Sequence, residues 1–313
     1  MRTQQTVNSP LLFPINNGRT FPVDEKSEKT QLHYEHPNGK LFLGNSINWL
    51  SRLENESVDL VFADPPYNIK KAEWDTFESQ EVYIQWSLSW IKEASRVLKN
   101  TGSLYICGFS EILADLKHPS SKYFNSCRWL VWNYRNKANL GNDWGRSHES
   151  ILHLRKSDEF SLRVDDVRIP YGNHTLKYPV HPQAETSNFG NGKDREHWTP
   201  NPLGAKPKDV IEIPTTCNGM GEKTPHPTQK PEELLRRLVL ATTDEGQLVL
   251  DPFSGSGTAI VVAEQLGRKW LGCELNYQYN QWAIERLEKV RRISVAEWIE
   301  LDRKNTERRE SIR

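Results

Sequence analysis

The chain has few cysteines, very little methionine and no excess of charge of either sign. Its 313 residues include 4 cysteines and 2 methionines, and 41 basic residues balance 41 acidic ones. No two cysteines have the spacing of a zinc site, so these scattered thiols fit a reducing compartment rather than a disulfide framework. The balanced charge argues against a uniformly basic coat protein for nucleic acid, although it leaves room for a local basic face.

Long apolar segments are also missing. No run approaches the roughly 20 apolar residues that span a bilayer, and the mean hydropathy is −0.72. The first residues lack the apolar segment of a secretory signal. Together with the unpaired cysteines, these absences predict a cytoplasmic protein without a membrane partner.

Regular patterning occupies two separate parts of the chain, as expected for one α/β domain with a sizeable insertion. Apolar runs and helical periodicity alternate up to about residue 156 and return after residue 222. Between these parts proline and glycine accumulate, which indicates either a recognition segment or a flexible connection. The charged residues after 291 predict a solvated helix or a frayed tail.

Short apolar runs predict the strands, and Val58–Ala63 is apolar enough to be covered on both faces of a parallel sheet. Strands are expected at Lys40–Gly44, Val58–Ala63, Ser103–Cys107, Arg128–Trp132, Ser150–Leu154, Gln247–Leu250 and Lys269–Glu274. Helices are expected from an N-cap at Ser79 to a C-cap at Gly102, from Pro231 onward, over Thr258–Leu266 and over Tyr279–Val290. Within the first helix, Trp86 and Trp90 recur at helical spacing, which predicts core packing.

Two polar sequences directly follow predicted strands and are the most informative feature of the chain. Asp64-Pro65-Pro66-Tyr67 follows Val58–Ala63, and the Gly-rich turn Asp251–Thr258 follows Leu248–Leu250. Open α/β sheets bind their ligands at the carboxyl ends of the strands. The first sequence suits an amine held beside an aromatic ring, and the second suits a nucleoside-like cofactor.

The Gly-rich turn has the features of a nucleoside-binding half-fold. Gly255 and Gly257 let the backbone approach a ligand closely, and Glu274, about 20 residues further on, can accept two ribose hydroxyls. Ile260 stands where the dinucleotide fingerprint has its third glycine, which weakens the case for a nicotinamide oxidoreductase. A ligand without a pyrophosphate, such as S-adenosylmethionine, fits better, and a purely structural strand-helix turn is the alternative.

His226-Pro227-Thr228-Gln229-Lys230-Pro231 precedes this half-fold. Thr228 and Lys230 could hold the carboxylate of the cofactor close to a helix N-terminus, where anions are favoured. A turn bounded by prolines, with solvated polar groups, is the alternative interpretation.

The Asp-Pro-Pro-Tyr sequence suits methyl transfer to an exocyclic amino nitrogen of a base. The lone pair of that nitrogen is conjugated with the ring, so acceptors must draw on its hydrogens before it can attack a methyl group. Asp64 can supply one acceptor and the Pro65 carbonyl the other, while the two prolines fix the backbone. Extruding the base costs a few kcal/mol, and stacking on Tyr67 recovers about 1–3 kcal/mol. A rigid turn after a strand is the alternative.

In this order, the sequences resemble the β-class DNA amino-methyltransferases, in which the Asp-Pro-Pro-Tyr block comes first and the cofactor turn last. The matching stretches are Leu43–Ile69, Trp132–Lys156 and Asn201–Leu287. The resemblance implies a Rossmann-like S-adenosylmethionine-dependent methyltransferase fold, circularly permuted, with an inserted target-recognition region. Its sheet would be mostly parallel with an antiparallel edge strand. One departure is Gly44-Asn45, where the family often has Gly-Asp, so that a hydrogen bond is kept and a charge is lost.

The resemblance also implies roles for individual residues and a division of the chain. The catalytic residues would be Asp64, Pro65, Pro66 and Tyr67. The cofactor-binding residues would be Asp251, Phe253, Ser254, Gly255, Gly257, Thr258 and Glu274, with Thr228 and Lys230 near the methionine end, and no metal is implied. The division would be an arm at 1–35, a catalytic half at 36–156, a target-recognition insert at 157–222, a cofactor-binding half at 223–290 and a charged tail at 291–313.

The partners implied are double-stranded DNA, a second copy of the chain and a cognate restriction endonuclease. The candidate DNA contacts are Lys137, Asn139, Asn142, Trp144 and Arg146 in a polar loop at Asn136–His148, and Arg163 and Arg168 in the insert. Asp at the first position of the block favours adenine N6, because enzymes of the family that methylate cytosine N4 usually carry Ser there. The DNA sequence recognised is not readable from these residues.

Four alternatives stay open. One is cytosine N4, which would be methylated by the same mechanism. Another is an amine of RNA or protein, although the long middle segment with its scattered basic residues favours DNA. A non-catalytic DNA-binding protein with a relic fold is opposed by the intact Asp64, Tyr67 and Glu274. A nicotinamide oxidoreductase is opposed by Ile260 and the Pro-Pro pair.

Overall fold

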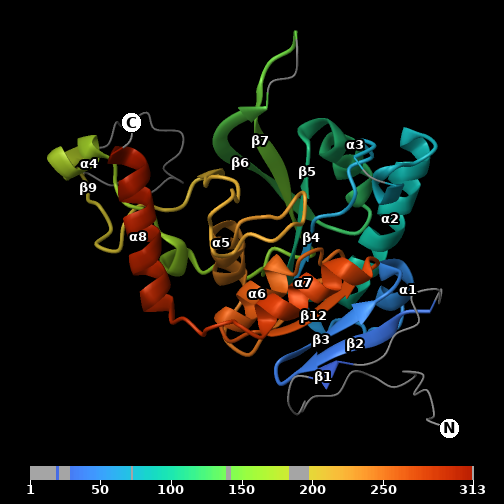
Figure 1. Ribbon diagram of the computed structural model, residues 1–313. Helices are drawn as coiled ribbons and strands as arrows, with labels where there is room; N and C mark the ends of the chain where they lie inside the picture. Colours follow the sequence, from blue (N-terminus) through green and yellow to red (C-terminus); the bar gives the residue numbers. More distant parts are fainter. Residues whose placement is uncertain (1–18, 21–28, 72, 139–141, 183–196, 312–313) are drawn as a thin grey trace. The chain divides into compact units, whose positions relative to one another are not determined.

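The computed structural model describes residues 19–20, 29–71, 73–138, 142–182 and 197–311 (Figure 1). The chain forms two compact units. One spans Met1–Leu162 and Asp209–Ile293, and the other spans Arg163–Lys208 and Ser294–Arg313. Over the described ranges, every helix is too short or too polar to cross a membrane.

The first unit is built on a sheet that has ten strands within the described residues, in the order β1-β2-β3-β12-β11-β4-β5-β7-β6-β10. These are β1 Arg19–Thr20, β2 Gln31–His36, β3 Gly39–Leu43, β4 Val58–Ala63, β5 Leu98–Gly108, β6 Ser126–Ala138, β7 Arg146–Arg155, β10 Val210–Glu212, β11 Leu248–Asp251 and β12 Lys269–Glu274. Strands β3, β12, β11, β4 and β5 pair in parallel. Strand β7 is antiparallel to β5 and β6, and β2 is antiparallel to β3 and β1. The expected mixed, mostly parallel α/β sheet is therefore confirmed.

Helices lie on this sheet and connect its strands (Figure 1). They are α1 Ser46–Leu50, α2 Gln80–Val97, α3 Ser110–Ser120, α5 Glu232–Thr242, α6 Thr258–Gln265 and α7 Tyr277–Leu287, with a 3-10 turn, η1, at Glu73–Asp75. As expected, Ser79 caps α2, and its side chain accepts a hydrogen bond from the Val82 N–H. The C-cap expected at Gly102 is wrong, because α2 ends at Val97 and β5 begins directly after it. Gly102 instead lies inside β5, where a Cβ atom would come within 2.8 Å of the Asp59 carbonyl oxygen.

Strands β6 and β7 are longer than their apolar residues indicate. The expected loop at Asn136–His148 is wrong in extent, since β6 runs to Ala138 and β7 begins at Arg146. Figure 1 shows β6 and β7 side by side, and their pairing extends to Ala138 and Arg146. An antiparallel pair that faces solvent needs no apolar side chains there, so the composition of this segment conceals the strands.

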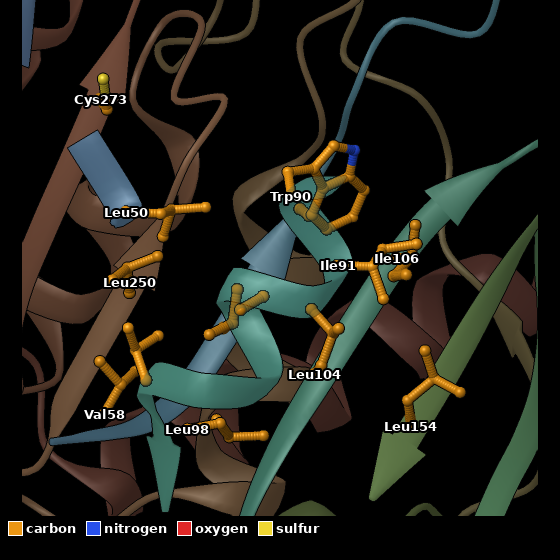
Figure 2. Packing of buried hydrophobic residues seen from close by; sticks show 14 of the residues in the cluster. Leu50, Val58, Trp90, Ile91, Leu98, Leu104, Ile106, Leu154, Leu250 and Cys273 are labelled. Carbon is orange, nitrogen blue, oxygen red and sulfur yellow. The ribbon is translucent and has the colours of Figure 1, made fainter. Parts of the chain in front are cut away.

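The core between α2 and the sheet is assembled from both halves of the sequence (Figure 2). Trp90 and Ile91 of α2 are fully buried, as are Leu104 of β5 and Leu250 of β11. Fully burying a side chain of this kind stabilises the fold by about 1.5–3 kcal/mol. The prediction of core packing is therefore confirmed for Trp90, and the core holds β4, β5 and β11 in fixed register with one another.

The second unit combines the middle segment with the charged tail. Its elements are η2 Val164–Val167, α4 Asn173–Lys177, β8 His181–Pro182, β9 His197–Trp198 and α8 Val295–Ser311. Helix α8 contacts η2, and Trp298 of α8 and Val167 of η2 are both buried. Of the two alternatives for the tail, the structure has the helix, and the buried Trp298 gives it a packed face.

Candidate active site

One cavity of about 520 Å³ joins the carboxyl ends of β4, β11 and β12. Cavities of roughly 300–1,000 Å³ are typical of sites for small ligands. The Asp64–Tyr67 block lines it on one side, and residues of the Gly-rich turn and Glu274 line it on the other. Parallel strands explain this meeting, since β11 pairs with both β4 and β12, although β4 ends at Ala63 and β11 begins only at Leu248.

The Asp64 carboxylate accepts two hydrogen bonds at the cavity, one from a hydroxyl and one from an ammonium group. Its Oδ1 accepts a hydrogen bond of 2.7 Å from the Tyr67 hydroxyl, and its Oδ2 accepts one of 2.7 Å from Lys230 Nζ. A second carboxylate, Glu149 of β7, lies beside them. Its Oε2 is 3.1 Å from the Tyr67 hydroxyl and 3.4 Å from Lys230 Nζ. We refer to Asp64, Tyr67, Glu149 and Lys230 as the acceptor cluster.

Charge and burial fix the protonation of this cluster. Burial alone would lower the pKa of Lys230, but the carboxylates of Asp64 and Glu149 outweigh it and raise that pKa above its usual range. Burial, together with the same two carboxylates, raises the pKa of Tyr67 well above its usual value. Lys230 therefore stays charged and Tyr67 stays a hydroxyl at neutral pH.

Asp75 organises the loop that follows the Asp-Pro-Pro-Tyr block. Its buried carboxylate accepts hydrogen bonds from four backbone N–H groups, those of Tyr67 at 2.6 Å, Asn68 at 2.8 Å, Ile69 at 3.2 Å and Lys71 at 3.1 Å. Hydrogen bonds to a charged acceptor are about twice as strong as neutral ones. Asp75 therefore fixes the backbone from which the Tyr67 ring projects. Sequence analysis missed it, because no local pattern marks an acid as the partner of backbone groups four to eight positions away.

The Gly-rich turn is shaped by backbone conformations that favour glycine. Gly255 and Gly257 have φ values of +52° and +80°. The Gly255 N–H donates to Glu274 Oε2 at 2.8 Å, and the Asn276 N–H donates to Oε1 of the same carboxylate at 2.8 Å. Burial raises the pKa of Glu274 and, to a greater extent, that of Asp251. Glu274 is thus held rigidly at the end of β12, with free lone pairs for hydroxyl donors.

All but one of the predicted cofactor residues line the cavity. Asp251, Phe253, Ser254, Gly255, Thr258, Glu274, Thr228 and Lys230 line the cavity. Gly257, alone among the described residues of this prediction, does not line it, and a Cβ atom there would lie 2.7 Å from the Ala283 Cβ. Its place in the structure is explained by the close packing of α6 against α7. Lys230 contacts Asp64 and Glu149, so the structure gives it partners at the opposite end from the Gly-rich turn.

Aromatic side chains form one wall of the cavity. The Phe253 ring centroid lies 5.7 Å from that of Trp86 and 5.2 Å from that of Trp90. Trp86 lines the cavity, so the core packing expected for it describes only part of its surroundings. Helical spacing identifies the inner face of α2, but it does not show that one end of that face opens on a ligand site.

His226 also lines the cavity, as a neutral side chain. Its ring centroid is 4.4 Å from that of Tyr279, and its Nδ1 accepts a hydrogen bond of 3.3 Å from the Thr228 N–H. Burial lowers the pKa of His226 to about 4. Asn45 lines the cavity as well, and its side chain caps α1 by accepting from the Ile47 and Asn48 N–H groups.

The candidate DNA contacts are spread over both units. The Arg146 guanidinium lies 3.6 Å above the Phe109 ring and pairs with Glu111 at 2.6 Å, and Phe109 makes an edge contact with Tyr67. Trp144 is 92% exposed. Arg163 and Arg168 belong to the second unit, where Arg168 pairs with Asp165 at 2.7 Å. Asn139 and the side chain of Lys137 lie outside the described residues. A role in DNA binding stays a prediction for all of them.

Comparison with known proteins agrees with this geometry. The sequence profile of the DNA methylase family, of the N6/N4 type, matches residues 58–285. The Type II methyltransferase M1.MboII of Moraxella bovis is 33% identical over 248 residues, which cover 77% of this chain and 93% of that protein. The DNA adenine methyltransferase YhdJ of Escherichia coli K12 is 32% identical over 269 residues, covering 84% of this chain and 87% of that protein.

A similar fold occurs in solved structures. The PvuII DNA methyltransferase, which is cytosine-N4-specific, superimposes with a TM-score of 0.60 at 18% identity, covering 84% of this chain and 92% of that one. The M1.HpyAVI complex with S-adenosylmethionine superimposes with a TM-score of 0.51 at 20% identity, covering 80% of this chain and all of that one, 100%. At these identities the likeness concerns the fold alone, and it confirms the expected Rossmann-like methyltransferase architecture.

Proposed function

The chain belongs to the N6/N4 family of DNA methylases, and on that premise we propose that it methylates the exocyclic N6 of an adenine extruded from duplex DNA. The family is S-adenosylmethionine-dependent, and this cofactor supplies an electrophilic methyl group carried on a sulfonium. The observation that carries the proposal is the single cavity shared by the Asp64–Tyr67 block and the Gly-rich turn. A base and a nucleoside cofactor bound at its two ends would face each other, as direct transfer requires.

The residues at the cofactor end fit a nucleoside. Glu274, held by two backbone N–H groups, would accept the ribose hydroxyls. Phe253 and Trp86 would bury a planar ring. Gly255 keeps the turn open, since a Cβ atom there would approach His226 Nε2 within 3.0 Å and narrow the cavity.

The residues at the other end would hold the base. Asp64 and the Pro65 carbonyl would accept hydrogen bonds from the amino group, and the Tyr67 ring would stack on the base. Lys230 keeps Asp64 in place, and Asp75 keeps the Tyr67 backbone in place. Because these acceptors are aligned before the reaction, little reorganisation opposes the charge that develops on nitrogen.

Adenine is proposed over cytosine because the block begins with Asp64. YhdJ, a relative of similar length, is named for adenine methylation. The likeness of fold to a cytosine-N4-specific enzyme makes N4-cytosine the second candidate. Both reactions need the same pair of acceptors, so the acceptor cluster is compatible with either.

The test is methyl transfer from labelled S-adenosylmethionine to unmethylated duplex DNA, followed by digestion and identification of the labelled nucleoside. N6-methyladenine is the expected product. Label in N4-methylcytosine would show that cytosine is the base methylated, with the same roles for Asp64 and the Pro65 carbonyl. Label in RNA or protein alone would overturn the proposal of a DNA substrate, and equimolar Asp64→Ala protein provides the background.

A further inference from the structure

Glu149 is the one member of the acceptor cluster to which the proposed function gives no task. It lies on β7, where antiparallel pairing with β6 sets it opposite Trp132. Its side chain is 17% exposed and lines the cavity. The Tyr67 hydroxyl lies between its Oε2, at 3.1 Å, and Asp64 Oδ1, at 2.7 Å. A hydroxyl has one proton, so it donates to one of these two carboxylates at a time.

Glu149 determines the net charge of the acceptor cluster. Lys230 Nζ lies 2.7 Å from Asp64 and, on its own, would neutralise that carboxylate. A neutral pair attracts a developing positive charge weakly. With Glu149 included, two carboxylates and one ammonium leave one net negative charge in a largely buried site, where electrostatic interactions are stronger than in water. That charge matches the single positive charge that the amino nitrogen acquires as it accepts a methyl group.

We propose that Glu149 is the final acceptor of the proton that the methylated amino group releases, and that it acts through the Tyr67 hydroxyl. This inference rests on the proposed function. The bond between nitrogen and the methyl carbon forms as the bond between sulfur and that carbon breaks, and the electron pair stays on sulfur. The nitrogen, now cationic, gives one proton to Asp64 Oδ1.

Asp64 then passes a proton to the Tyr67 oxygen while Tyr67 passes its own hydroxyl proton to Glu149 Oε2. Tyr67 ends as a neutral hydroxyl, Asp64 is again a carboxylate, and Glu149 holds the proton until the opened site returns it to solvent. Lys230 keeps its protons throughout. Charge and atoms balance without a metal or a further reactant, and Tyr67 has a second task beside stacking.

The test compares single-turnover rates of methyl transfer to DNA for the wild type and for Glu149→Gln, which keeps shape and acceptor oxygen but removes the charge. A fall of about 100-fold or more is expected, since positioned acid–base groups contribute roughly 10²–10⁴-fold. Dissociation constants for S-adenosylmethionine and for DNA should stay within about threefold of the wild type. These constants also establish that the variant is folded.

Three further variants separate the relay from a structural clamp. Glu149→Asp should restore at least about tenfold of the lost rate, because it returns the charge. Tyr67→Phe should lose as much rate as Glu149→Gln, and the double variant should be no slower than the slower single variant, as expected for residues of one chain of transfer. Glu285→Gln, the same change at an exposed position of α7, should match the wild type.

Two results would overturn the relay. One is a Glu149→Gln rate within about twofold of the wild type. The other is a lost rate that Glu149→Asp does not restore, with weaker binding of cofactor or DNA, which would make Glu149 a structural contact only. If the wild type leaves DNA unlabelled, the proposed function is wrong and the relay, which rests on it, is wrong as well. If only the relay is wrong, the wild type labels DNA and Glu149→Gln does so at a similar rate. The same assay therefore distinguishes the two failures.

Discussion

Asp64 connects the members of the acceptor cluster at the end of the cavity that would hold the base. Its two carboxylate oxygens already hold Tyr67 and Lys230 in place. A change at this position therefore removes an acceptor for the amino group and also leaves the Lys230 ammonium with Glu149 as its remaining ion-pair partner within the cluster.

We expect Asp64→Ala to bind S-adenosylmethionine with an affinity within a few fold of the wild type and to lose methyl transfer by about 10²-fold or more, as when a preorganised charge-stabilising group is removed. The proposed ribose and ring contacts, Glu274 and Phe253, lie at the carboxyl ends of β12 and β11 and do not touch Asp64, so binding should survive where transfer is lost. Calorimetric titration and the labelled-DNA assay measure the two quantities. Near-normal turnover would remove Asp64 from the mechanism.

Asp75 provides the second prediction at this scale. We expect Asp75→Asn to lower the free energy of unfolding by about 1.5–3 kcal/mol, the range for hydrogen bonds to a buried charged group. Each carboxylate oxygen accepts two of the four N–H groups; in Asn the one remaining oxygen accepts two of them less strongly, and the NH₂ group faces the other two donors. Urea denaturation measures the loss, and Asp158→Asn, at an exposed position, is the matched control. Equal stability of the two variants would refute this role.

Helices α6 and α7 show how closely elements must approach at the cofactor end. Gly257 combines a φ of +80° with a Cβ position 2.7 Å from the Ala283 Cβ. Gly246 has almost the same φ, +79°, with nothing within 4 Å of its Cβ position. The pair therefore separates the cost of backbone conformation from the cost of crowding between two helices.

We expect Gly246→Ala to destabilise the protein by about 1–2 kcal/mol through backbone strain alone. Gly257→Ala should cost about 1–3 kcal/mol more, because crowding between packed elements adds to the strain. It should also weaken cofactor binding, since Gly257 is the N-cap of α6 and stands between the lining residues Ser256 and Thr258. Thermal or urea unfolding of both variants measures the difference, and indistinguishable variants would show that α7 simply moves aside.

Elements that carry their own pattern were predictable from the sequence. Strands β4 and β12 have the predicted bounds, because each is an apolar run between polar residues. The Asp-Pro-Pro-Tyr block and the Gly-rich turn were located for the same reason, since each follows directly on such a run. Pairing between distant strands has no local signal, and Glu149 reaches Tyr67 only through the register of β7 on β5 and β6. Gly102 shows that a local signal can also mislead. A glycine after a helical pattern predicts a C-cap, but this one lies inside β5, where the neighbouring strand leaves no room for a Cβ atom.

Two buried neutral histidines link the stability of the whole molecule to pH. Burial lowers the pKa of His226 to about 4 and that of His153 to about 3. In the unfolded chain each protonates near pH 6.5, so the unfolded state gains protons as the pH falls below 6.5 while the folded state does not. Stability is therefore lost from about pH 6.5 down to the folded pKa values.

We expect the two histidines to lower the free energy of unfolding by about 2 kcal/mol each between pH 7 and pH 5. The buried carboxyls Asp251 and Glu274, whose pKa values are raised, oppose part of this trend, because their folded forms gain protons first. His153→Gln, away from the cavity, should flatten the slope, and urea denaturation at the two pH values measures it. An unchanged slope in this variant would contradict a neutral buried His153.

The order of strands in the sheet has a consequence for how the protein is made. Strands β11 and β12 are among the last to be synthesised, yet they lie between β3 and β4, which are among the first. A nascent chain that ends before Leu248 therefore has two open strand edges and half a cavity. The ribosome must deliver the chain through Glu274, the end of β12, before the sheet can close, so translation interrupted earlier yields no partly active fragment. A cell that makes this protein obtains methylating activity only from chains translated beyond β12.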